Sequence, residues 1–396
     1  MGTVERIPVA AGILEWARRT AGYGVAEAAR KLSVKEERVL AWENGELAPT
    51  VVQLRNIAKL YKRPLAVLLL PAPPRDFDAL RDFRRITEAS NPSWSPALHA
   101  EYKRALTQRD VLQEIGEISP ASLPVTQEYD FQLARDSDPE AAGLKLREVI
   151  GMNSWNSGTV SNPAKALRAA VDAVEGFGIS VLQSRDIDVA EMRGFSISEW
   201  PHPIIVLNGS DWPRPKLFTL LHELSHIGLN AGGLCDLHEA APNRSDSGER
   251  VERFCNRVAA SALMPRALVM ADAEVKRTHN WTLDALAGIS ARFGASAEAF
   301  LLRLVTLGMV EWETYRSLKP LLDARYAAAR RAEKAKLQAS PGGPPYYAVK
   351  ARNLGRGYVE SVLDAYQSQA ITSYDVADYL DIKYDQLPRL QEAVLR

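Results

Sequence analysis

A His-Glu-x-x-His motif lies inside an apolar stretch of this chain, at His222, Glu223 and His226. Residues four apart in an α-helix lie one above the other, so both imidazoles share a helical face and can reach one metal ion. Glu223 is rotated by about 100° from His222 at helical pitch, which places it beside the ion and not on it. Zinc binds neutral imidazole and carboxylate, and catalytic zinc keeps a position open for water. The spacing therefore predicts a helix with two zinc ligands and a glutamate placed to orient a metal-bound water.

Five residues also match by chance, so the flanking sequence has to decide. Apolar residues recur around the motif at helical spacing, at Leu217, Phe218, Leu220, Leu221, Leu224 and Ile227. Gly228 and the pair Gly232-Gly233 supply stop signals. The alternative is a core helix whose histidines are satisfied by hydrogen bonds. Two histidines on one face, with a glutamate beside the first, favour the metal.

A third ligand is expected from a second helix, over residues 248–264, which ends at Pro265. Glu252 lies at the edge of its apolar stripe, and Asn256 follows one turn later on the same face. We therefore expect Glu252 to bind the metal and Asn256 to orient a ligating histidine. Glu249 is the competing ligand, and Cys235 in a glycine-rich loop is another. A solvated helix charge is the alternative for Glu252.

These segments carry a family resemblance. Three stretches, His222-Glu-Leu-Ser-His226, Glu252-Arg-Phe-Cys-Asn256 and Leu263-Met-Pro265, resemble the ImmA/IrrE family of zinc metallopeptidases over about residues 160–300. The resemblance implies a zincin-like domain in which His222, His226 and Glu252 bind Zn²⁺ and Glu223 is the general base. It also implies a strand before the zinc helix, matched by residues 203–207, along whose edge the substrate strand is expected to add. The chain departs from the family at Phe254, where a second acidic residue is frequent.

Short helices joined by tight turns are predicted near the N-terminus, at residues 13–21, 25–32, 35–45 and 51–61. Trp42-Glu43-x-Gly45 and Pro49-Thr50 within them resemble the Xre-type repressor domain, which implies a five-helix helix-turn-helix unit. Residues 1–74 carry 11 Lys/Arg and 7 Asp/Glu, a net charge of +4. The candidate DNA contacts are Lys31, Lys35, Arg38 and Arg55. Glu36 and Glu37 would repel phosphates, so a helical interaction or dimerisation domain, and with it a homodimer, is the alternative.

Composition bounds the rest. The 396 residues are formally neutral, 46% hydrophobic and contain no apolar run of 18 residues, so no membrane span is expected. The N-terminus lacks the apolar core of a signal peptide. The only cysteines, Cys235 and Cys255, are interpreted as reduced thiols. Together these features favour a cytoplasmic protein.

The expected fold is mainly α with a small sheet (α+β), divided at proline-rich linkers. We expect a helix-turn-helix domain at 1–74, a helical linker region packing on the protease at 75–150, a metallopeptidase domain at 151–338 and a small helical C-terminal module at 346–396. Seven of the thirteen tyrosines fall in that last segment, which suits an interface or a small core.

The resulting functional hypothesis is a cytoplasmic zinc-dependent metallopeptidase that cleaves a specific protein, such as a transcriptional repressor. It would be linked to stress response or to mobile-element or toxin–antitoxin regulation. His202 and His238 are candidates for oxyanion or substrate contacts. The alternative is a DNA-binding regulator, or an antitoxin-like interaction protein, whose peptidase domain is a sensor or scaffold. The intact Glu223 favours the enzyme, because a scaffold has no need of that carboxylate.

Overall fold

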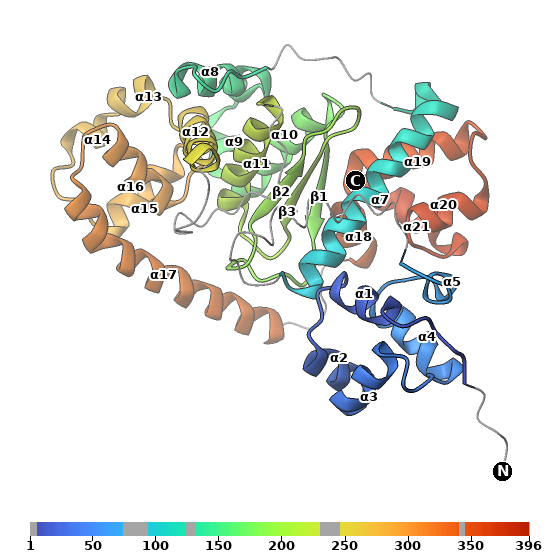
Figure 1. The fold of residues 1–396 in the computed structure, drawn as a ribbon. Helices are drawn as coiled ribbons and strands as arrows, with labels where there is room; N and C mark the ends of the chain where they lie inside the picture. Colours follow the sequence, from blue (N-terminus) through green and yellow to red (C-terminus); the bar gives the residue numbers. More distant parts are fainter. Residues whose placement is uncertain (1–5, 74–93, 124–131, 230–245, 340–344, 396) are drawn as a thin grey trace. The chain divides into compact units, whose positions relative to one another are not determined.

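The computed structural model describes residues 6–73, 94–123, 132–229, 246–339 and 345–395 (Figure 1). These residues are mostly helical and include a three-stranded sheet, so the expected α+β class is confirmed. The chain forms two compact units, one ending at Arg104 and the other beginning at Ala105. No helix in the described ranges is long and apolar enough to cross a bilayer.

The N-terminal unit contains short helices that enclose a core of their own. They are α1 (Ile13–Arg19), α2 (Val25–Leu32), α3 (Glu36–Glu43), α4 (Val51–Leu60) and α5 (Leu65–Leu68). Thr50 begins α4 with a capping box, in which the side chains of Thr50 and Gln53 each bind the other's backbone N–H. Arg18 donates two hydrogen bonds, of 2.7 and 2.9 Å, to the buried carboxylate of Glu43, which ties α1 to α3.

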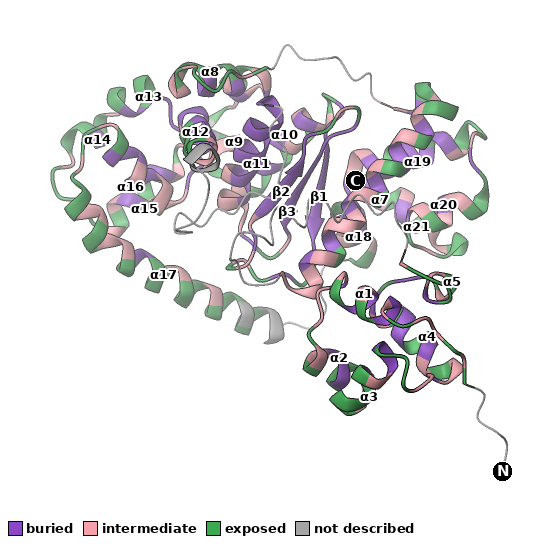
Figure 2. Ribbon diagram, in the orientation of Figure 1, coloured by how far each residue is buried: buried purple, intermediate pink, exposed green. Residues whose placement is uncertain are grey.

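The sheet lies in the second unit and consists of β1 (Ser180–Ser184), β2 (Gly194–Ile197) and β3 (Ile204–Asn208). The strand order is β1-β3-β2, with β3 parallel to β1 and antiparallel to β2. All three strands are buried along their length (Figure 2). Because β3 pairs on both sides, the expectation that a substrate strand adds along residues 203–207 is wrong. The outer strands are β1 and β2.

Helices pack around α11 and the sheet, and all of them except α9 contribute residues to one hydrophobic core. They are α8 (Pro139–Val149), α9 (Ser157–Ser161), α10 (Pro163–Glu175), α11 (Pro213–Gly228), α12 (Asp246–Leu263), α13 (Arg266–Ala271), α14 (Ala273–Arg277), α15 (Leu283–Ala291), α16 (Ala297–Thr306) and α17 (Trp312–Ala339). Single-turn 3₁₀ helices lie at Pro120–Ser122, Met152–Ser154 and Tyr384–Gln386. The described residues of α17 after Arg325 are largely exposed, as their charge density indicates (Figure 2).

A second core in this unit joins the part of helix α7 (Pro96–Ile118) that follows Arg104 to the C-terminal helices. These are α18 (Tyr346–Leu354), α19 (Arg356–Gln367), α20 (Ser373–Tyr379) and α21 (Leu387–Leu395). Val111, Leu112 and Ile115 of α7 are buried in this core. Gln108 donates a buried 2.9 Å hydrogen bond to the carbonyl of Leu354. The region predicted as one linker, 75–150, therefore divides between two cores, because α8 packs in the core around the sheet.

Candidate metal centre

The helix α11 places the two motif histidines inside the core around the sheet. It begins after Trp212 with Pro213, a residue suited to the first helical position because its missing N–H would have no partner there. The second half of the helix is buried throughout, and His222 and His226 are 0% and 2% exposed. Their Nε2 atoms face each other at 3.1 Å.

Glu252 lies on α12, and its carboxylate is close to the Nε2 atoms of both histidines. Its Oε2 lies 3.4 Å from Nε2 of His222 and its Oε1 lies 3.7 Å from Nε2 of His226. One ligand atom from each of the three side chains lies within 4.8 Å of the other two. The structure thus brings together three residues that the sequence places 4 and 26 positions apart.

These distances fit a tetrahedral metal ion. Zinc bonds to nitrogen and oxygen measure about 2.0–2.2 Å, so the ligand atoms of a tetrahedral site stand about 3.3–3.6 Å apart. The observed spacings of 3.1, 3.4 and 3.7 Å scatter about that range. A cation between the two Nε2 atoms would accept a lone pair from each ring, which requires that each imidazole carry its proton on Nδ1. Nδ1 of His222 is buried and has no hydrogen bond among the described residues, so no group of the described structure sets the orientation of that ring through Nδ1.

Glu223 lies beside this cluster and is completely buried. Its Oε2 accepts a 2.9 Å hydrogen bond from the hydroxyl of Ser196 on β2. The approach of β2 to α11 depends on Gly194, where a Cβ would lie 2.5 Å from Cγ2 of Thr219 and 3.0 Å from the carbonyl oxygen of Val206. Glu223 is therefore held by the sheet, next to the candidate ligands. Ser196 was not identified in the sequence, where only a short Gly-Phe-Ser-Ile segment marks its strand.

The remaining candidates from the sequence lie in different places. Asn256 is half-buried one turn after Glu252, and no hydrogen bond joins it to either imidazole in the described structure. Its orienting role stays a prediction. Cys235 and His238 lie outside the described residues, as does the side chain of Glu249.

His202 is buried before β3, in a pocket that none of the three candidate ligands or Glu223 lines. The structure therefore does not bring His202 to the metal cluster. The basic candidates of the N-terminal unit, Lys31, Lys35, Arg38 and Arg55, are all exposed. Exposure allows contact with phosphates, and it leaves the choice between DNA and another partner open.

Comparison with known proteins bears on this centre. Residues 174–305 match the family model Peptidase_M78, described as the IrrE N-terminal-like domain. The matched range contains the three strands, α11 and α12. It therefore includes the three candidate metal ligands and Glu223. It supports the resemblance to the ImmA/IrrE family and a metallopeptidase activity. The N-terminal helices and α18–α21 lie outside it. No curated protein matches the chain.

Proposed function

We propose that this chain is a zinc-dependent metalloendopeptidase of the HExxH type. The observation that carries the proposal is the convergence of two imidazoles and one carboxylate on a point beside the buried Glu223. His222, His226 and Glu252 would hold the ion. When bound, zinc would act as a Lewis acid that activates water and polarises a peptide carbonyl.

Glu223 would supply the proton transfers. Its carboxylate would take a proton from the attacking water and deliver it to the leaving amine as the peptide bond breaks. Ser196 donates a hydrogen bond to Oε2 of this carboxylate. Holding one oxygen in this way fixes the carboxylate plane before substrate arrives, which reduces the reorganisation needed for reaction.

The substrate strand is proposed to add to β2. This strand pairs with β3 on one side and with no strand of the described residues on the other. Because Ser196 of β2 contacts Glu223, a peptide paired along β2 would pass close to the general base. Backbone pairing binds any sequence, so specificity would come from side-chain contacts outside the strand.

The N-terminal unit supports the proposal that the enzyme cleaves one specific protein. Its helices resemble an Xre-type repressor domain, so we propose that the enzyme acts in the cytoplasm on a transcriptional regulator, bound directly or at its operator. A homodimer is compatible with this role. The test is Glu223→Gln, which should retain zinc and abolish cleavage of the partner in cells. Identical partner lengths with wild type and variant would rule out the peptidase.

The second candidate is a DNA-binding regulator whose peptidase domain binds zinc as a sensor or scaffold. This candidate is supported by four basic side chains that are exposed and could contact DNA phosphates: Lys31, Lys35, Arg38 and Arg55. Salt-dependent gel shifts with Lys35→Glu or Arg38→Glu test it, because removing one phosphate-neutralising side chain lowers the slope of log affinity against log salt by about one. Absence of salt-sensitive binding by the wild type would remove this candidate in favour of a protein-interaction domain.

A further inference from the structure

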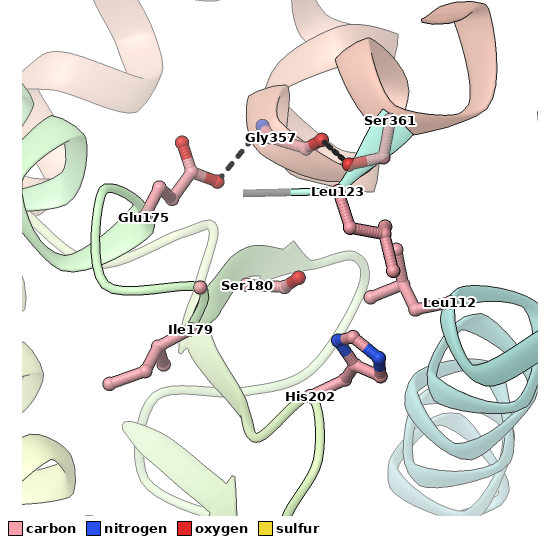
Figure 3. Close-up of a pocket in the computed structure, with 9 residues that line it drawn as sticks. Leu112, Leu123, Glu175, Ile179, Ser180, His202, Gly357 and Ser361 are labelled. Atoms are coloured by element: carbon pink, nitrogen blue, oxygen red, sulfur yellow. Dashed lines mark hydrogen bonds between the residues drawn. The ribbon is translucent and has the colours of Figure 1, made fainter. Parts of the chain in front are cut away.

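A pocket that the proposed peptidase does not use lies between β1, α7 and α19 (Figure 3). Leu112, Leu123 and Ile179 supply apolar walls, and Glu175, Ser180 and His202 supply polar groups. About 20 Å³ is free for the centre of a water-sized group. That is enough for one such group, but it must find polar partners to be stable there.

His202 is the most deeply placed ring among the polar side chains that line this pocket. It is only 8% exposed, and its imidazole points into the pocket across from Glu175 (Figure 3). No side chain or backbone group of the described residues forms a hydrogen bond with this imidazole, which lines the pocket wall. Burial, and then the charge of Arg109, lower the pKa of His202, so the ring is neutral and offers one nitrogen as an acceptor.

Glu175 presents a second acceptor. Its Oε1 accepts hydrogen bonds from the backbone N–H groups of Gly357 at 3.2 Å and Val181 at 3.4 Å. Its Oε2 makes none within the described structure. The buried hydroxyl of Ser180 is a third acceptor. A group that donates several hydrogen bonds, and is no larger than water, would satisfy this end of the pocket.

The pocket continues into a groove of about 650 Å³ between α10 and α19, with Glu175 and Leu123 lining both. Arg168 and Asp172 on α10 pair at 3.9 Å, and Arg356 and Glu360 on α19 pair at 2.9 Å. Asp364, one turn beyond Glu360, forms no ion pair in the described structure. Above pH 7, where Glu175 is ionised, Glu175 and Asp364 have no matching cation among the described residues, so the groove is negative. Its volume is that of a small-molecule site.

We propose that the pocket and groove bind a linear aliphatic amine with two or more ammonium groups. The terminal ammonium enters the pocket and donates to His202, Glu175 and Ser180. The methylene chain lies along Leu123, and a further ammonium faces Asp364. An ammonium has three donors and no acceptor, which matches a site where Oε2 of Glu175, the Ser180 hydroxyl and one nitrogen of His202 can each accept a hydrogen bond. Because the ligand contacts both α10 and α19, its binding stabilises the attachment of the C-terminal helices.

Calorimetric titration of the full chain with spermidine and 1,4-diaminobutane, at pH 8, where Glu175 is ionised, and about 0.15 M salt, tests the proposal. Both amines should bind saturably, and 1,4-butanediol should not. Glu175→Gln keeps an oxygen for the two backbone N–H groups but loses the charge, so affinity should fall about tenfold or more. Asp364→Asn, an exposed change that does not endanger folding, should weaken spermidine binding about threefold.

The matched control is Asp378→Asn on α20, which removes the same charge at an exposed position outside the groove. Affinity should be unchanged. Absence of amine binding by the wild type overturns the proposal, and so does equal binding by Glu175→Gln and the wild type. Diol binding of the same strength would also overturn it, because charge would then not be recognised. Glu223→Gln should bind the amine normally, so this result is independent of peptidase activity.

Discussion

The hydroxyl of Ser196 donates a 2.9 Å hydrogen bond to Oε2 of Glu223, across the boundary between β2 and α11. Ser196 is 2% exposed and Glu223 is 0% exposed, so the bond is shielded from bulk solvent. The bond ties the candidate general base to the strand that we propose for substrate pairing. The position of Glu223 and the position of the substrate would therefore both depend on β2.

Ser196→Ala should lower kcat for the cognate substrate about tenfold, which corresponds to about 1.4 kcal/mol of transition-state free energy. The buried carboxylate would lose a donor that fixes its plane. KM and zinc content should stay near wild type, because Ser196 does not contact the three metal-binding candidates. Ser196→Thr, which keeps a hydroxyl, should recover part of the rate. Loss of zinc in Ser196→Ala would instead indicate a structural role.

Glu252→Ala should lower zinc affinity by more than the roughly 10–100-fold that removal of an outer-shell partner costs, because a ligand itself is removed. Metal analysis after dialysis measures the effect. Glu274→Ala, an exposed carboxylate on α14, is the control and should keep its zinc. Undiminished zinc in Glu252→Ala would point to Glu249 or Cys235 as the third ligand.

Gly194→Ala should destabilise the protein by about 1–3 kcal/mol, the usual cost of overpacking a core. The added Cβ would press on Thr219 and the backbone of Val206, and β2 would have to move away from α11. Gly288→Ala on the exposed side of α15 is the matched control, because a Cβ there meets nothing within 4 Å. It should gain up to about 1 kcal/mol from helix propensity. Denaturant unfolding distinguishes the two, and equal stabilities would contradict close packing at Gly194.

Glu175 should make stability depend on pH. Burial raises the pKa of Glu175 from 4.5 to about 7, against the two backbone hydrogen bonds that lower it. Between these values the folded protein binds more protons than the unfolded chain, so this residue's contribution to stability falls as the pH rises from about 4.5 to 7. Glu175→Gln removes this dependence and should be more stable than wild type at pH 8 by about 1–2 kcal/mol, allowing for partial exposure.

Unfolding by urea at pH 5, 6, 7 and 8 measures this difference. Glu148→Gln, an exposed change on α8, should keep the wild-type dependence on pH. A Glu175→Gln protein that loses stability between pH 5 and 8 as steeply as the wild type would show that another group is responsible.

Much of the candidate site could be predicted because it depends on local geometry. Helical pitch alone places His222 and His226 on one face, whatever surrounds them. The same periodicity identified the helix that carries Glu252, and the structure brings Glu252 within 3.4 Å of His222. The local pattern did not select the third ligand by itself, because Glu249 and Cys235 are compatible with it as well as Glu252.

Contacts between distant segments were not predictable in this way. Ser196 meets Glu223 across 27 residues, and Gln108 meets Leu354 across 246. The placement of β3 between β1 and β2, and of His202 in a pocket of its own, likewise depends on how separate elements pack. The sequence by itself determined the residue types, the helical spacing of the motif and the mainly helical class, because each follows from interactions between near neighbours. Only the tertiary structure decided the order of the strands, the donor to Glu223 and the partners of α7, because side-chain packing selects among many arrangements that the same local patterns allow.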